Sequence, residues 1–253
     1  MPVQIEQKAN GVVEVILANP ARRNALTHEM FLSLAALWPR LGEDPAVRAI
    51  VLRGEGPTFC AGADLSADLT SLPGIDDLID RALLKTAFMP KPLIAAIRGA
   101  CVAGGLELAL AADIRIAAHD AVLGLPEVRW GIMPSGGGTM KLIDQIGQAK
   151  AMDLLFTGRL IDGLTAEGIG LITTALPAED VYDQALATAQ QIAKNSPVAV
   201  QAAKRAALAT RMAGYCSQEP AERQMVAEVR RSGHPRIGID AFLSKRIPEY
   251  PDS

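Results

Sequence analysis

Aromatic residues, cysteines and histidines are scarce in this sequence. Aromatics make up 4% of its 253 residues, and it has three cysteines and three histidines. Because Cys60, Cys101 and Cys216 are odd in number and widely spaced, they are typical of reduced thiols in a cytosol and do not indicate a disulfide framework. The histidines lie far apart without a ligand spacing such as HExxH, so the sequence predicts no metal site.

Long runs of like charge and long apolar runs are also absent. The formal net charge is -3 at pH 7, and no basic stretch is long enough to follow a phosphate backbone, so nucleic acid is not an expected partner. The N-terminal MPVQIEQKANG has no apolar signal core. Arg98, Glu107 and Asp113 interrupt the most apolar stretch, well short of the roughly 18 residues of a membrane helix. We therefore expect a soluble, cytoplasmic protein with no export signal and no membrane partner.

What the sequence does have is length and many small apolar side chains. Apolar residues make up 49% and charged residues 21% of the chain, close to the averages for globular proteins. A chain of this length can form one large domain, or a core domain with a smaller helical appendage. Alanine is very frequent, which favours helices that pack closely against one another.

The first half of the chain alternates β-rich runs with helical patterns. We expect strands at residues 12–18, 49–53, 93–98 and 113–118, and helices at residues 28–41, at residues 76–88 and after the glycine pair 104–105. This alternation indicates an α/β fold. Runs such as AIVLR and LIAAI lack strict alternation of apolar and polar residues, so we expect these strands to be covered on both faces.

From residue 136 the pattern is helical almost throughout. Helical segments are expected at residues 139–156, 179–195, 197–212, 219–233 and 239–246. Asn195, Ser196 and Pro197 are residues typical of the end of one helix and the start of the next. We therefore divide the chain into a core domain, residues 1–195, and a C-terminal helical subdomain, residues 196–253.

Two turns that contain glycine could supply backbone hydrogen-bond donors. Gly104 and Gly105 open a helix, whose first amides have no partner within the helix and can bind an anion. The segment FCAGADL, residues 59–65, follows a predicted buried strand. Two amides from separate loops would suit an oxyanion on a thioester. From these residues alone, tight helix–strand packing is the favoured explanation of Gly104 and Gly105, and an ordinary turn explains FCAGADL as well as an oxyanion hole does.

Two glutamates lie where they could move protons. Glu107 is one helical turn beyond Gly104, and Glu127 lies in the apolar segment LGLPEVRWG, where loss of solvent should raise its pKa. The alternative for each is an exposed or ion-paired glutamate. SGGG at residues 135–138 could be another helix N-terminus that opens on the same cavity, but neither a P-loop nor a dinucleotide fingerprint is present.

Six segments together resemble a known family. NPARRNAL, FCAGADL, ACVAGGLELALAADIRIA, GLPEVRWGIMPSGGGT, LLFTGR and AFLSKR occur in the order and spacing of the enoyl-CoA hydratase/isomerase (crotonase) family, along nearly the whole chain. The resemblance implies a spiral of ββα turns with roughly perpendicular sheets. It also implies a C-terminal helical region that forms a homotrimer or a dimer of trimers.

The resemblance also implies an activity and its residues. The implied enzyme is an enoyl-CoA hydratase of the kind used in fatty acid β-oxidation, which acts on an acyl-CoA thioester. Glu107 would deprotonate the water that attacks C3, and Glu127 would protonate C2, while the amides of Ala63 and Gly104 form the oxyanion hole. No metal or redox cofactor is implied, because polarisation of the thioester does the electronic work, and coenzyme A is itself part of the substrate. Residues implied in substrate and coenzyme A binding are Arg22, Ala61, Asp64, Leu65, Phe242 and Lys245.

The sequence departs from the family pattern at two positions. Ala103 stands where many members have glycine, and Ser66 stands where well-studied hydratases have a lysine that contacts the coenzyme A phosphates. The second change leaves Arg22 and Lys245, with Arg23 as a further candidate, to bind the phosphates.

Three other functions stay open. An enoyl-CoA isomerase would use one glutamate as a shuttle base, and a specialised hydratase or dehydratase would act on a carnitinyl, hydroxymethylglutaryl-type or aromatic acyl group. A non-catalytic acyl-CoA binding protein would need neither glutamate. The two glutamates favour hydration, but nothing in residues 65–88, which we expect to line part of the acyl pocket, selects the acyl group.

Overall fold

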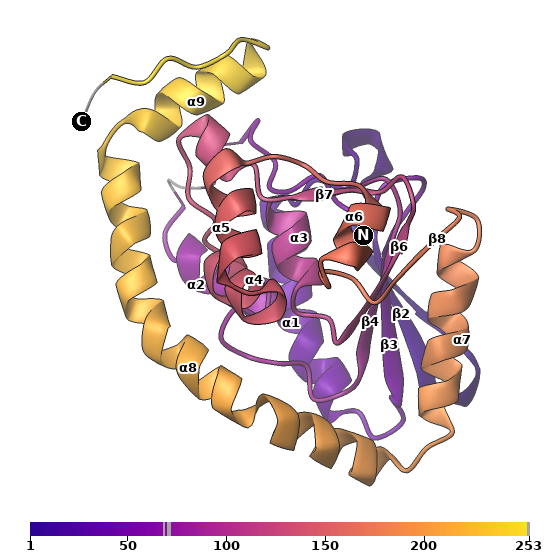
Figure 1. The fold of residues 1–253 in the computed structure, drawn as a ribbon. Helices are drawn as coiled ribbons and strands as arrows, with labels where there is room; N and C mark the ends of the chain where they lie inside the picture. Colours follow the sequence, from indigo (N-terminus) through magenta and orange to yellow (C-terminus); the bar gives the residue numbers. More distant parts are fainter. Residues whose placement is uncertain (68, 70–71, 252–253) are drawn as a thin grey trace.

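The structure is a computed structural model that describes residues 1–67, 69 and 72–251. Its centre is a six-stranded sheet in the order β1-β2-β3-β4-β6-β8, parallel except for the β1–β2 pair (Figure 1). The strands are β1 Val3–Gln7, β2 Val12–Leu17, β3 Ala49–Gly54, β4 Leu93–Ile97, β6 Ile114–Ala118 and β8 Thr174–Leu176. A separate parallel pair joins β5 Ala100–Val102 to β7 Val122–Gly124.

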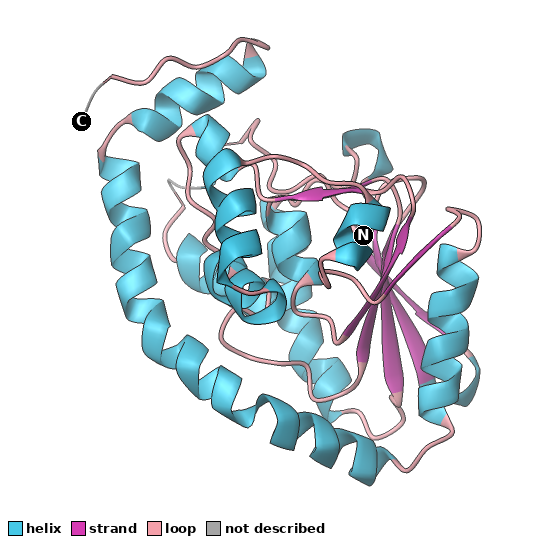
Figure 2. Cartoon of the chain, in the orientation of Figure 1, coloured by secondary structure: helices cyan, strands magenta, loops and turns pink. Residues whose placement is uncertain are grey.

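Helices surround the sheet, as Figure 2 shows in cyan around magenta. The α-helices are α1 His28–Glu43, α2 Ile75–Ala82, α3 Gly104–Ala109, α4 Gly138–Ile146, α5 Gln148–Thr157, α6 Gly163–Gly168, α7 Val181–Ala193, α8 Pro197–Arg231 and α9 His234–Leu243. The short 3₁₀ helices are η1 Ala9–Gly11, η2 Pro20–Arg22 and η4 Glu127–Trp130.

The central strands are buried on both faces, which confirms the expectation from their unbroken apolar runs. All residues of β2 and β4 are buried. Helix α7 packs on β3, β4 and β6, and its buried Ala185 and Ala189 allow a close approach. Helices α1, α3 and α4 lie on the other side of the sheet (Figure 1). The core therefore lies on both sides of the parallel strands.

Helix α8 is a single helix of 35 residues that arches around the outside of the core (Figure 1). The expected break between residues 212 and 219 was wrong, because the helix continues through Pro220, although a proline cannot donate a backbone hydrogen bond. In contrast, the helix expected at residues 139–156 is broken at Gly147, where a φ of 80° separates α4 from α5.

Other boundaries also differ from expectation. The helix expected at residues 76–88 ends at Ala82, and Leu84 then takes a φ of 52° that a helix cannot accommodate. Strands β1, β5, β7 and β8 were not expected. Residues 68, 70 and 71 of the expected acyl-pocket segment, and residues 252–253 of the expected helical subdomain, lie outside the described residues.

The α7–α8 connection lies where we divide the chain. Helix α7 ends at Ala193, and the Ser196 side chain caps α8 by accepting a hydrogen bond from the Ala199 amide. The division at residue 195 stays a prediction. None of the helices in the described part of the chain is both long and apolar enough to cross a bilayer.

Candidate active site

Glu107 is held by the loop that precedes α4. Its Oε1 accepts hydrogen bonds from the amides of Gly136 at 2.7 Å and Gly138 at 3.0 Å. The side chain projects from α3 and the residue is 4% exposed. Burial raises the pKa of Glu107 to about 7, although the hydrogen bonds from Gly138 and Gly136 oppose that shift. A carboxyl with this pKa is partly ionised near neutral pH and can act as a base.

This contact assigns a different role to SGGG from the one that the sequence suggested. The amides at the start of α4 bind the carboxylate of Glu107, whereas the sequence pattern is also compatible with a helix N-terminus that opens on the ligand cavity. Glycine is needed here because a Cβ on Gly136 would overlap Leu83 Cδ1 and lie 2.8 Å from Glu107 Oε2. The glycines thus allow the backbone to approach the carboxylate closely.

Glu127 is the second buried carboxyl. It begins η4 directly after Pro126 and is 8% exposed. Its Oε2 is buried and accepts no hydrogen bond from any residue that the structure describes. Burial, and then the charge of Glu107, raise the pKa of Glu127 well above the ordinary value. This shift favours the protonated form of Glu127, which can act as an acid, so one pair combines a base and a proton donor.

Two backbone amides lie side by side near α3. Leu26 pairs with Ala63 in a short parallel bridge, in which the Leu26 amide bonds to the Gly62 carbonyl at 2.8 Å. A Cβ built on Gly104 would lie 3.7 Å from the Ala63 nitrogen. Neither the Ala63 nor the Gly104 amide donates a hydrogen bond to another described residue. The two loops singled out in the sequence therefore bring two free donors together, as an oxyanion hole requires.

Ala103 precedes Gly104 in a backbone conformation that suits glycine. Its φ is 51° and its ψ is -129°, a region that side chains with a Cβ seldom occupy. The amide of Ala103 donates to the Gly124 carbonyl at 3.0 Å, so β7 helps to hold the turn. Replacement of the family's glycine is therefore accommodated, but with backbone strain next to the oxyanion-hole amide.

The residues implied in coenzyme A binding form two groups. In the first, Arg22 Nη1 pairs with Asp64 at 2.8 Å and with the hydroxyl of Ser66 at 2.6 Å. The Ala61 amide donates to the Arg23 carbonyl at 3.0 Å, while the Arg23 side chain is exposed. Leu65, next to Asp64, is partly buried. Arg22 thus stays beside the loop that carries Ala63, where it could meet an anion.

The second group lies on α9. The ring of Phe242 packs edge-on against Trp130, with 5.0 Å between the centroids, and Trp130 ends the helix that Glu127 begins. A Cβ on Gly238 would overlap the Trp130 carbonyl, so α9 and η4 touch through their backbones. Lys245 follows α9, is exposed, and forms no ion pair with another residue in the described ranges.

Sequence reasoning missed three buried charges around this site. Lys85, Lys141 and Glu222 are 3%, 2% and 6% exposed. The lysines interrupt the apolar runs LLKTAF and TMKLI, a signal that could have marked them as buried. Glu222 lies in a polar stretch of α8, where nothing distinguishes it from a solvated side chain.

A metal centre would need several His, Cys, Asp or Glu side chains close together. In the described part of the chain, no group of three His, Cys, Asp or Glu side chains is placed to hold a metal ion. The three cysteines are free thiols, with Cys60 and Cys101 buried and Cys216 exposed.

Comparisons with known proteins agree with this geometry. The chain matches the family described as Enoyl-CoA hydratase/isomerase over residues 7–253. It is 36% identical to enoyl-CoA hydratase EchA19 of Mycobacterium tuberculosis, over 97% of this chain and 95% of that protein. It is 32% identical to the 2,3-dehydroadipyl-CoA hydratase of Escherichia coli, over 97% of both chains. The structure of a carnitinyl-CoA dehydratase from Mycobacterium avium is similar, with a TM-score of 0.90, 33% identity and coverage of 100% of this chain and 99% of that one.

Proposed function

This chain belongs to the enoyl-CoA hydratase/isomerase family, and we propose that it is a hydro-lyase that adds water reversibly across the 2,3 double bond of a trans-2-enoyl-CoA. The expected family and the crotonase-like α/β fold are confirmed by the match over residues 7–253 and by the TM-score of 0.90. The observation that carries the proposed reaction is the buried pair of Glu107 and Glu127, beside two amides that donate to no other described residue.

In this proposal the Ala63 and Gly104 amides bind the thioester oxygen. Glu107 takes a proton from water as the water oxygen bonds to C3, and the electrons of the double bond move toward the thioester oxygen as an enolate. Glu127 then gives its proton to C2, and the enolate collapses to the 3-hydroxyacyl thioester. The raised pKa of Glu127 supports its role as the donor, because only a protonated carboxyl can deliver that proton.

The proposal includes an acyl-CoA thioester as substrate and no separate cofactor. Polarisation of the thioester by two amides supplies the electronic activation, so each step uses only the chain's own groups and water. Arg22, beside Asp64, and Lys245, after α9, are the cations that we assign to the coenzyme phosphates. Arg23 remains the alternative to Arg22.

A specialised acyl group is the second candidate. Its support is the similarity to a carnitinyl-CoA dehydratase and to a 2,3-dehydroadipyl-CoA hydratase, whose named substrates carry polar ends. The same pair of glutamates would serve that reaction. A 3-enoyl-CoA isomerase and a non-catalytic binding protein are the remaining alternatives, and the second would not need two buried carboxyls.

We also propose that the chain assembles as a homotrimer or a dimer of trimers. Three large apolar side chains on α5, on α6 and between them are exposed, namely Phe156, Leu160 and Leu164. Burial against another copy would remove this apolar surface from water. Light scattering of the purified protein would test the assembly. The cytoplasmic location and a role in fatty acid β-oxidation stay predictions.

The decisive experiment follows the absorbance of the conjugated thioester when the protein meets crotonyl-CoA. We expect turnover in the wild type and a loss of about 100-fold or more in Glu107→Gln and in Glu127→Gln. Glu43→Gln, an exposed residue at the end of α1, is the matched control and should keep full activity. Tight binding of acyl-CoA with no turnover on crotonyl, longer 2-enoyl, 3-enoyl or polar acyl thioesters would overturn the enzyme assignment.

A further inference from the structure

The loop that binds Glu107 contacts two buried lysines on its other side. A Cβ on Gly137 would lie 3.4 Å from Lys85 Cγ and 3.4 Å from Lys141 Cε, whereas those on Gly136 and Gly138 would meet Glu107. Lys141 Nζ also donates to the Leu84 carbonyl at 2.7 Å. The loop thus lies between the carboxylate of Glu107 and the side chains of two buried lysines.

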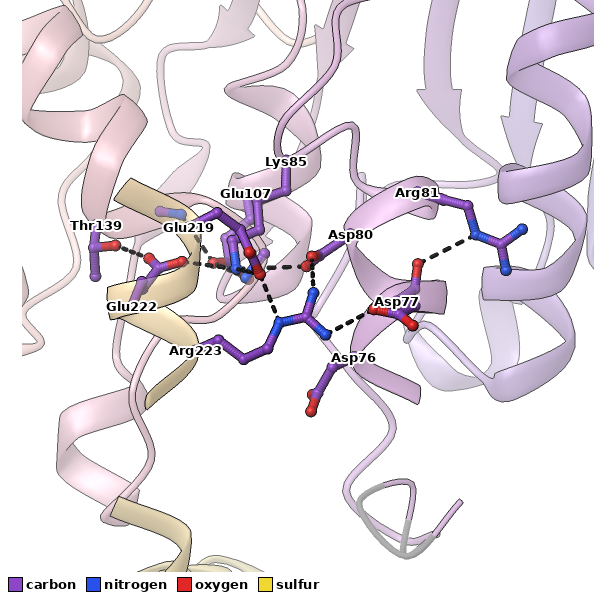
Figure 3. Close-up of polar contacts among 12 residues, drawn as sticks. Asp76, Asp77, Asp80, Arg81, Lys85, Glu107, Thr139, Glu219, Glu222 and Arg223 are labelled. Atoms are coloured by element: carbon purple, nitrogen blue, oxygen red, sulfur yellow. Dashed lines mark hydrogen bonds and ion pairs between the residues drawn. The ribbon is translucent and has the colours of Figure 1, made fainter. Parts of the chain in front are cut away.

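Helix α8 supplies two carboxylates to Lys85, of which Glu222 lies nearest and Glu219 lies 3.7 Å away. Glu222 pairs with Lys85, with 2.8 Å between Nζ and Oε2, and its other oxygen accepts a hydrogen bond from the hydroxyl of Thr139. Thr139 is the residue after Gly138, whose amide holds Glu107. Figure 3 shows Glu222 between Thr139 and Lys85, close to Glu107. One carboxylate from α8 therefore contacts both a lysine that backs the loop and the residue that follows it.

Farther out, a more exposed set of ion pairs joins α8 to α2. Arg230 forms two hydrogen bonds with Asp76, at 2.6 Å and 2.8 Å. Arg223 contacts Asp77 at 2.7 Å and Asp80 at 2.8 Å (Figure 3). These outer pairs fasten α8 to α2 itself, whereas the inner pair joins α8 to the segment after α2, and no outer pair includes a residue of the Gly136–Gly138 loop. They provide a comparison for the buried inner pair.

Charged groups from four elements face Glu107. They are Glu127 from η4, Glu222 from α8, Lys85 from the segment after α2 and Lys141 from α4. Burial and the two loop hydrogen bonds have the largest effects on the pKa of Glu107. Among the charges, that of Glu222 raises this pKa and that of Lys85 lowers it. Burial lowers the pKa of Lys141 to about 7, so this lysine is only partly charged near neutral pH and has a weaker effect on Glu107. Asp80, 3.5 Å from Lys85 Nζ, lies behind that lysine.

We propose that Glu222 and Lys85 are positioning residues for Glu107. Docking of α8 places Glu222 on Lys85 and Thr139, and this contact sets both the place of the Gly136–Gly138 loop and the charge that Glu107 meets. The active site is therefore incomplete until α8 is docked. This inference rests on the proposed function in one respect. If Glu107 is the base, its ionisation can be followed in the pH dependence of the hydration rate.

The rival explanation is that the ion pairs only fasten α8 to the core. In that case, removal of any pair would lower stability and activity together, and the inner pair would behave like the outer ones. A positioning role instead predicts a change in the pH dependence that only the inner pair produces.

The test compares Glu222→Gln with Arg230→Gln in the full chain. Glu222→Gln keeps an acceptor for Thr139 but removes the negative charge, so the rise of kcat/KM with pH should move to lower pH by about one unit. The maximal kcat should fall about tenfold, because Glu107 becomes a weaker base, while KM stays within about twofold. Arg230→Gln should lower the melting temperature and leave the pH profile unchanged.

A second pair of measurements keeps the outcomes distinct. Lys85→Met removes a positive charge that lowers the pKa of Glu107, so the rise of kcat/KM should move to higher pH. If that variant does not fold, Glu222→Gln decides alone. Titration of isotope-labelled glutamate carboxyls by NMR, with Glu107→Gln to assign the signal, reads the ionisation of Glu107 directly. Failure of the proposed function appears as no turnover by the wild type, whereas failure of this inference appears as an unchanged Glu107 titration in Glu222→Gln, or an equal shift in Arg230→Gln.

Discussion

Glu107 and Glu127 are two buried carboxyls whose charges interact, and of the two only Glu107 accepts hydrogen bonds from the amides of Gly136 and Gly138. The two amides that bind Glu107 oppose the effect of its burial, whereas the buried Oε2 of Glu127 lacks such support among the described residues. The charge of Glu107 also raises the pKa of Glu127. Similar burial thus leaves Glu107 as the group that ionises first and Glu127 as the group that keeps its proton.

The pH dependence of hydration should reflect this order. We expect kcat/KM for crotonyl-CoA to rise with pH as Glu107 ionises, near its pKa of about 7, and to fall at higher pH as Glu127 loses its proton. Initial rates measured from about pH 5 upward would follow the rising limb, and a fall at the alkaline end would report the loss of the Glu127 proton. A profile that stays flat through neutral pH would contradict the assignment of Glu107 as the base.

The base should also reduce stability at neutral and alkaline pH. The pKa of Glu107 is raised from 4.5 in the unfolded chain to about 7 in the folded one. Because the folded protein binds this proton more tightly, the resulting stability is fully present below pH 4.5 and is lost as the pH rises through about 7. Glu107→Gln should therefore be more stable than wild type by about 3 kcal/mol near pH 8, with little difference near pH 4. Urea unfolding at both pH values would measure this, with Glu43→Gln as the control.

The glycine that donates to Glu107 should be sensitive to a single methyl group. A Cβ on Gly136 would push against Leu83 and Glu107, so Gly136→Ala should displace the carboxylate and reduce kcat by about 10-fold to 100-fold with a small change in KM. Gly168→Ala in α6 is the matched control, because a Cβ there would have no atom within 4 Å. Equal kcat in the two variants would show that the loop tolerates displacement.

The motifs allowed much of the site to be predicted before the structure. Glu107, Ala63 and Gly104 lie in short segments whose spacing along the chain carries the family pattern, and their local turns bring the two amides together. Lys85 and Glu222 could not be found in this way. Their contact joins distant parts of the chain through an unbroken α8, and the sequence had suggested two separate helices there.

The end of the helix expected at residues 76–88 was also predicted wrongly, because it is not visible in the local sequence pattern. The helix expected to run to residue 88 ends at Ala82, the chain turns at Leu84, and Lys85 then pairs with Glu222 of α8. Apolar spacing in LLKTAF continues past that turn, so periodicity alone does not reveal the end. Tertiary contacts decided the boundary.

The strained turn before the oxyanion hole should be relieved by the residue that many family members have. With a φ of 51° at Ala103, Ala103→Gly should stabilise the fold by about 1 kcal/mol, because glycine adopts this conformation without a steric penalty. Ala109→Gly in α3, where the backbone is helical, should instead cost about 1 kcal/mol. Chemical unfolding of both variants would measure the difference, and destabilisation by Ala103→Gly would contradict the strain.

Recognition of the coenzyme should depend on Arg22 more than on its neighbour. Arg22 is held beside the Ala63 loop by Asp64 and Ser66, whereas no described contact fixes the exposed side chain of Arg23. Arg22→Gln removes a positioned cation and leaves Asp64 to repel a phosphate. We therefore expect its KM for crotonyl-CoA to rise about fivefold to tenfold at low salt, and less at high salt.

A thioester without phosphates separates binding of the coenzyme from damage to the loop. With crotonyl-pantetheine, Arg22→Gln should have the KM of the wild type, because the contact that the variant loses is absent from that substrate. Arg23→Gln, which changes the same charge one residue away, should behave like wild type with both substrates. A larger effect in Arg23→Gln would transfer the phosphate contact to that residue, and an equal effect of Arg22→Gln on both thioesters would mean that Arg22 acts by supporting the Asp64 loop instead.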